Sequence, residues 1–229
     1  MPSYWGAHRW DTPVAAPTSS IAKPSDTLPR PRPRIESLSD MVFGLALSVG
    51  ALALVATPPT SSEQLYSDIV TFGFSFLILI MVWFSYTRIM SEMTFEDHRT
   101  LTLNTVLLFT VSVEPFLFNL LHSANHLNGF FNAASQAYAV DLGLMMVILG
   151  LFAWGLSVST QPPLALSVRT GFRAEAINRW VAAGIFFVTV APVFDQVSVG
   201  PEPLRIWLWL IPLFFFAFAR RTRRKAEGP

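Results

Sequence analysis

Residues 39–52 read Ser-Asp-Met-Val-Phe-Gly-Leu-Ala-Leu-Ser-Val-Gly-Ala-Leu, and this stretch opens the first long apolar segment of the chain. On an α-helix, Leu45, Ser48, Val49 and Leu52 fall at positions i, i+3, i+4 and i+7 and therefore lie on one face. We call these four residues the Leu45 stripe. The stripe predicts a helix with a narrow apolar seam that carries one hydroxyl group, a pattern that an ordinary membrane helix can also show.

A second face of the same helix carries only small residues. Ala46, Gly50 and Ala53 lie roughly 100° around the helix from the Leu45 stripe. Small side chains allow helices to approach closely inside a membrane. Asp40 lies roughly opposite the stripe, so we expect its carboxyl group to face a neighbouring helix.

The composition is that of a membrane protein. Of the 229 residues, 52% are hydrophobic and 14% are charged, which is too apolar for a soluble domain of this size. The apolar segments cover residues 38–56, 66–87, 101–121, 134–156, 176–195 and 203–219, and each is near the ~20 residues that span a bilayer. The sequence therefore predicts an all-α integral membrane protein with six transmembrane helices and a single repeat.

The distribution of basic residues predicts the orientation. Residues 1–33 are rich in Pro, Ser and Arg and read as a disordered tail, 34–219 as the transmembrane domain, and 220–229 as a basic tail. Of the 16 Lys and Arg residues, 15 are assigned to the two tails, to the connection from the second to the third segment, or to the connection from the fourth to the fifth. The exception is Arg205. This positive-inside pattern predicts that both termini are cytoplasmic.

Two further points concern the connections and the first tail. The connection between the fourth and fifth segments is taken to hold Arg169, Arg173 and Arg179. The first 33 residues lack the apolar core of a secretory signal peptide.

Polar residues gather at the predicted cytoplasmic end of the first three segments. Ser39 is a plausible N-cap, and Asp40 in a first helical turn would be favoured by the helix dipole. Either Arg34 or Arg88 could pair with Asp40, although Arg88 could also be only a topology-setting charge. The full predicted polar network comprises Arg34, Ser39, Asp40, Trp83, Tyr86, Arg88 and Asn104.

Three acidic residues lie within the other apolar segments. A charged group at the centre of a membrane helix costs about 2.5–3.5 kcal/mol on insertion scales. Glu114, Asp141 and Asp195 are therefore either neutral groups hydrogen-bonded inside the bundle or sites for a proton or cation. Glu114 precedes Pro115, which is expected to kink its helix.

Several classes of site have no support in the sequence. The chain has no cysteine, which excludes disulfides, thiolate metal sites and cysteine nucleophiles. His122 and His126 lack a matched ligand set, so we predict no metal site and no cofactor. The metalloprotease, P-loop and nucleophile-elbow motifs are also missing, so we predict that the protein is not an enzyme.

Four short patterns in order resemble one known family. Residues 34–40, Arg-Ile-Glu-Ser-Leu-Ser-Asp, resemble the Arg-x-x-x-Phe-Ser-Asp signature of the transmembrane protein 175 family of potassium channels. Residues 83–88, residues 103–116 and Tyr138-Ala139 resemble the second, third and fourth helices of that family.

The sequence departs from the family pattern at three positions. Leu38 replaces the signature Phe, Tyr86 stands where many relatives carry His, and Glu114 occupies a position expected to be apolar. The Tyr86 change puts in doubt any part of the polar network that depends on that His.

The resemblance implies a potassium-selective channel. It implies a homotetramer in which the first helix lines a central pore, K⁺ as the conducted ion, and a prokaryotic cell membrane as the location. Carried over by position, Leu45 corresponds to the bottleneck, Ser48 to a hydroxyl layer that contributes to selectivity, and Val49 and Leu52 to the apolar positions beyond it. The implied partners are other copies of the chain, monovalent cations and membrane lipids, with no nucleic acid.

A second class of function remains open. Glu114, Asp141 and Asp195 could serve a secondary transporter or proton-coupled carrier. Such carriers often contain internal repeats, and no repeat is visible here.

Overall fold

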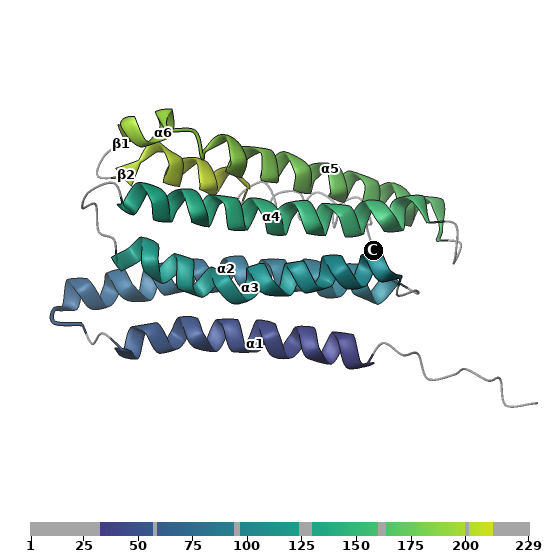
Figure 1. The fold of residues 1–229 in the computed structure, drawn as a ribbon, viewed down its shortest axis with the longest axis horizontal. Coiled ribbons are helices and arrows are strands. Elements are labelled where there is room, and N and C mark those ends of the chain that lie inside the picture. The colour runs from purple at the N-terminus through teal and green to yellow at the C-terminus, as the bar shows by residue number, and fades with distance from the viewer. Residues whose placement is uncertain are drawn as a thin grey trace, which may run out of the picture.

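A computed structural model describes residues 33–56, 59–93, 97–123, 130–159, 164–199 and 202–212. The predicted tails, apart from Pro33, lie outside these residues. Within them, the all-α prediction is confirmed, and the helices run antiparallel to one another in chain order (Figure 1). The elements are α1 (Pro33–Ala56), α2 (Ser62–Glu92), α3 (His98–Ser123), α4 (Phe130–Val158), α5 (Leu166–Val188), α6 (Val193–Gln196), β1 (Ser198–Val199) and β2 (Glu202–Pro203), followed by a helical stretch at 204–212.

The long helices form a layered bundle. α1 lies at one edge, α5 lies at the opposite edge, and α2, α3 and α4 lie between them (Figure 1). The short strands β1 and β2 pair antiparallel beside α6. Val82, Leu107, Tyr138 and Leu149 are fully buried where the middle helices meet. The core is therefore built mainly from α2, α3 and α4, and α1 packs onto it from one side.

Local capping explains two helix starts. Ser61 precedes α2, and its hydroxyl accepts a hydrogen bond from the Gln64 backbone N–H at 3.1 Å. Asp97 precedes α3 and accepts from the Thr100 backbone N–H at 2.8 Å. Hydrogen bonding from Thr100 holds the pKa of the Asp97 carboxyl below its usual value.

Three helices are long and apolar enough to cross a membrane. They are α2, residues 98–121 of α3, and α4. The apolar part of α1, residues 37–52, is shorter than these three. This search covers only the described part of the chain. The predicted six-span topology therefore remains a prediction.

The predicted start of the fifth segment, at residue 176, was wrong. α5 begins at Leu166, so Arg169, Arg173 and Arg179 lie on the helix and not in the connection before it. The helix can extend this far because its basic groups find partners. Arg169 Nε donates to the Ser157 carbonyl at 3.0 Å, and the Arg173 guanidinium lies 5.6 Å from the centre of the Trp154 ring.

Glycines on α4 allow aromatic rings of α5 to approach its backbone. A Cβ atom added at Gly143 would lie 2.8 Å from the Phe187 ring, and one added at Gly150 would overlap the Trp180 indole. The Trp180 ring is itself held against Trp154, with 5.5 Å between ring centres. The close contact between α4 and α5 therefore requires glycine, which has no side chain, at positions 143 and 150.

We expect Gly150→Ala to lower the melting temperature of the purified protein in detergent. Overpacking costs roughly 1–3 kcal/mol, which exceeds the ~0.5–1 kcal/mol that alanine gains over glycine in a helix. Gly155→Ala is the matched control, because a Cβ there meets nothing within 4 Å. An equal loss of stability in both variants would contradict the proposed role of the close approach.

Candidate functional site

The Leu45 stripe faces away from the rest of the chain. The exposed fractions are 63% for Leu45, 46% for Val49 and 64% for Leu52. Ser48 is also exposed, and its hydroxyl donates to the Gly44 carbonyl of its own helix at 2.8 Å. The face singled out by the sequence is therefore a surface of the single chain.

The opposite side of α1 is packed against α2 and α3. Phe43 and Ala46 are buried, and a Cβ atom added at Gly50 would lie 3.5 Å from the Phe72 ring and 4.0 Å from Pro115. The small flank of α1, at Ala46 and Gly50, thus serves close packing within the chain. The side chain of Ala53 lies outside the described residues.

A buried hydrogen-bonded cluster joins α1 to α2 and α3. The hydroxyl oxygens of Ser39 and Tyr86 are 2.7 Å apart, and Asn104 Nδ2 donates to Ser39 Oγ at 3.4 Å. Ser39 is fully buried, and the Tyr86 ring also packs against Phe43. The structure thus brings these three predicted network residues together. The N-cap expectation for Ser39 was wrong, because α1 begins six residues earlier at Pro33.

Asp40 lies beside this cluster but is exposed. Its carboxylate accepts a hydrogen bond from Trp83 Nε1 at 2.9 Å. Arg88 does not pair with Asp40 but forms an ion pair with Glu175 at 3.4 Å, because its side chain is directed toward α5. The side chain of Arg34, the other suggested partner, lies outside the described residues.

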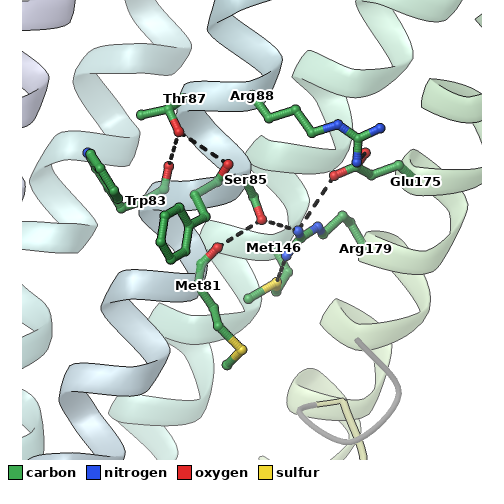
Figure 2. Close-up of polar contacts among 9 residues, drawn as sticks. Met81, Trp83, Ser85, Thr87, Arg88, Met146, Glu175 and Arg179 are labelled. Carbon is green, nitrogen blue, oxygen red and sulfur yellow. Dashed lines mark hydrogen bonds and ion pairs between the residues drawn. The ribbon is translucent and has the colours of Figure 1, made fainter. Parts of the chain in front are cut away.

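A second polar cluster joins α2, α4 and α5, and sequence reasoning missed it (Figure 2). The buried Arg179 guanidinium donates to Ser85 Oγ, lies 3.6 Å from the Glu175 carboxylate, and approaches Met146 Sδ at 3.5 Å. Glu175 thereby lies between Arg179 and Arg88. The spacing of Glu175 and Arg179, four residues apart, is the one signal that could have revealed this pair.

Glu114 is held by hydroxyl groups in the middle of the bundle. Ser75 Oγ lies 3.0 and 3.2 Å from its two carboxyl oxygens, and Tyr138 Oη lies 3.1 Å from one of them. Glu114 is fully buried, so these contacts satisfy a polar group that water does not reach. Asp141 is also buried, and its Oδ2 has no hydrogen-bond partner among the described residues.

The remaining predicted or counted polar residues lie elsewhere. Arg205 is buried, and its Nε donates to the Thr189 carbonyl at 2.5 Å, while Trp209 Nε1 donates to the Thr189 hydroxyl at 3.0 Å. Arg205 therefore anchors the helical stretch 204–212 to α5. The side chain of Asp195 lies outside the described residues. Within the described ranges, no group of three His, Cys, Asp or Glu residues could hold a metal ion.

Long apolar helices joined by buried hydrogen bonds between their side chains define a helical integral membrane protein. Residues 34–115 match the sequence model of a family described as the endosomal/lysosomal potassium channel TMEM175. Over these residues the chain is similar to the transmembrane protein 175 family, and the predicted resemblance is confirmed. The matched range holds the Leu45 stripe and the cluster around Ser39.

One curated relative extends this comparison. The chain is 28% identical over 137 residues to a protein named "Potassium channel" from Marivirga tractuosa. The alignment covers 54% of this chain and 54% of the relative, so the chain spans about half the length of the curated relative that it matches.

The cluster around Ser39 leads to a stability prediction. Tyr86→Phe keeps the ring against Phe43 but removes a hydroxyl bonded to buried Ser39, so we expect the free energy of unfolding to fall by about 1–3 kcal/mol. Tyr66→Phe, on the same helix but exposed, is the control and should be neutral. Denaturation of both purified variants measures the difference. A neutral Tyr86→Phe would mean that the hydroxyl contact does not hold α1.

Proposed function

We propose that this chain is one subunit of a potassium-selective cation channel in which α1 lines the pore. One observation carries the proposal most directly. The family-matched helix leaves its Leu45 stripe exposed while its other side is packed on α2 and α3. The name of the Marivirga tractuosa relative supports potassium as the ion.

The proposed assembly is a homotetramer. Four copies of α1 would place four Leu45 side chains around a common axis. A ring of leucines excludes an ion because dehydration is expensive and leucine offers no ligand in return. Ser48, about one turn further along the helix, would add four hydroxyl oxygens next to the ring and so contribute to the choice of potassium over sodium.

The remaining parts of the proposal concern the mode of conduction, the membrane and the role of the polar network. Conduction would be passive, without enzymatic chemistry or a cofactor, in a prokaryotic cell membrane with both termini cytoplasmic. Lipids would cover the other exposed apolar side chains, such as Val70 on α2 and Phe109 on α3. The polar network around Ser39 would act as a scaffold that holds α1 in place rather than as an ion site.

The oligomer can be tested directly. Native mass measurement of the purified protein in mild detergent should give four copies of the 25.5 kDa chain. Four copies of the chain would bring their exposed Leu45 and Leu52 side chains together around the proposed ion path. A stable monomer or dimer in the same conditions would rule out the central pore.

The pore assignment is tested by reversal potentials under potassium and sodium gradients. We expect Leu45→Ala to raise flux and lower the preference for potassium, because the constriction widens. Ser48→Ala should keep conduction but weaken discrimination, because hydroxyl ligands are lost with little change in width.

Two controls make the result specific. Leu77→Ala removes an equally exposed leucine from α2, and Ser67→Ala removes an exposed hydroxyl from the same helix; neither should change selectivity. Unchanged reversal potentials in tetrameric Leu45→Ala and Ser48→Ala would refute the pore-lining role. Flux in liposomes at carrier-like rates, requiring a coupled gradient, would instead favour a transporter.

A further inference from the structure

Neighbouring residues of α2 make hydrogen bonds to both α1 and α5. On one side, Trp83 donates to Asp40 and the Tyr86 hydroxyl contacts Ser39, both on α1. On the other side, Ser85 accepts from Arg179, which lies on α5. We call residues 83–88 the α2 junction.

The contact between the α2 junction and α5 is electrostatic. Arg88 and Arg179 bracket the same Glu175 carboxylate, at 3.4 and 3.6 Å (Figure 2). Arg88 also lies over the Phe172 ring, with its guanidinium 5.7 Å from the ring centre. Arg88 of α2 is therefore held by Glu175 and by the Phe172 ring, and Ser85 of α2 is held by Arg179.

Arg179 is the buried member of this contact. Only 5% of its surface is exposed, and its guanidinium meets groups from three helices: Ser85 of α2, Met146 of α4 and Glu175 of α5. A buried guanidinium is costly unless its partners keep their places, and removing one partner is strongly destabilising. Arg179 therefore fixes α2 relative to α4 and α5 at this level of the bundle.

The same level of α2 fixes α1. Ser85, which meets Arg179, and Tyr86, which meets Ser39, are consecutive residues. The contacts to α5 and to α1 therefore come from the same turn of α2. Leu45 follows Ser39 by six residues, about 9 Å along a rigid helix. A displacement of the α2 junction would therefore move the Leu45 stripe with it.

We propose that Arg179 is a positioning residue for the Leu45 stripe, acting through the Ser85–Tyr86–Ser39 contacts. This inference rests on the proposed pore function, and it extends the functional unit beyond the family-matched residues 34–115 to α5. The assembly would repeat any displacement in every copy of α1, so a small shift at Arg179 would change the whole constriction.

The first measurement reports position and needs no ion current. The chain has no cysteine, so Met41→Cys on α1 and Ile177→Cys on α5, both exposed, can carry a pair of spin labels. We expect Arg179→Gln to shift or broaden the label-to-label distance by about 2 Å, the scale of known helix shifts. Arg179→Lys, which keeps the charge, should restore most of the original distribution.

The second measurement reports selectivity. Arg179→Gln should reduce the potassium-to-sodium permeability ratio by roughly threefold while the protein keeps the oligomeric state of the unmodified protein, and Arg179→Lys should recover most of that ratio. Arg173→Gln removes an exposed arginine of the same helix whose ring partner is Trp154 of α4 and not a residue of the α2 junction, so it should leave both measurements unchanged. If Arg179→Gln does not fold, Ser85→Ala replaces it, because that change removes only the α2 partner and leaves the Glu175 pair.

The outcomes separate the two proposals. An unchanged label distance in Arg179→Gln, or in Ser85→Ala where that variant is used, overturns the positioning role whatever the protein conducts. A changed distance with an unchanged permeability ratio in a conducting protein also overturns it. Absence of potassium-selective flux in the unmodified protein refutes the proposed function, while the label distances still report whether Arg179 holds α1.

Discussion

The structure depends on one constraint: a polar side chain buried between membrane helices can be stabilised only by partners on the protein, because lipid offers none. Ser39 meets Tyr86 and Asn104, Glu114 meets Ser75 and Tyr138, and Arg179 meets Ser85. Each cluster joins three helices of the bundle. The polar contacts therefore set the register between helices, while apolar packing supplies the area of contact.

In α1, the buried polar contact leaves the face that carries the Leu45 stripe exposed. Ser39 and Phe43 are buried against α2 and α3, which fixes the rotation of the helix about its axis. Given that rotation, Leu45 and Leu52 can only face outward. The polar contact near the start of the helix and the exposed stripe further along it are thus two consequences of the same orientation.

The departures from the family pattern are accommodated by local chemistry. Tyr86 stands where many relatives carry His, and its hydroxyl makes the contact to Ser39. Glu114 stands at a position expected to be apolar, and Ser75 and Tyr138 donate to it. Both changes keep a satisfied polar group inside the bundle, which explains how the sequence can differ there without an unpaired group at either position.

The sequence by itself determined the helical class, the common face of Leu45, Ser48, Val49 and Leu52, and the resemblance of residues 34–115 to one family, because helical periodicity and short signatures are local properties. Only the tertiary structure decided that this face is exposed, that Arg88 pairs with Glu175 rather than Asp40, and that Arg179 is buried. Those outcomes depend on which helices become neighbours and how each is rotated, and packing across the whole bundle sets both.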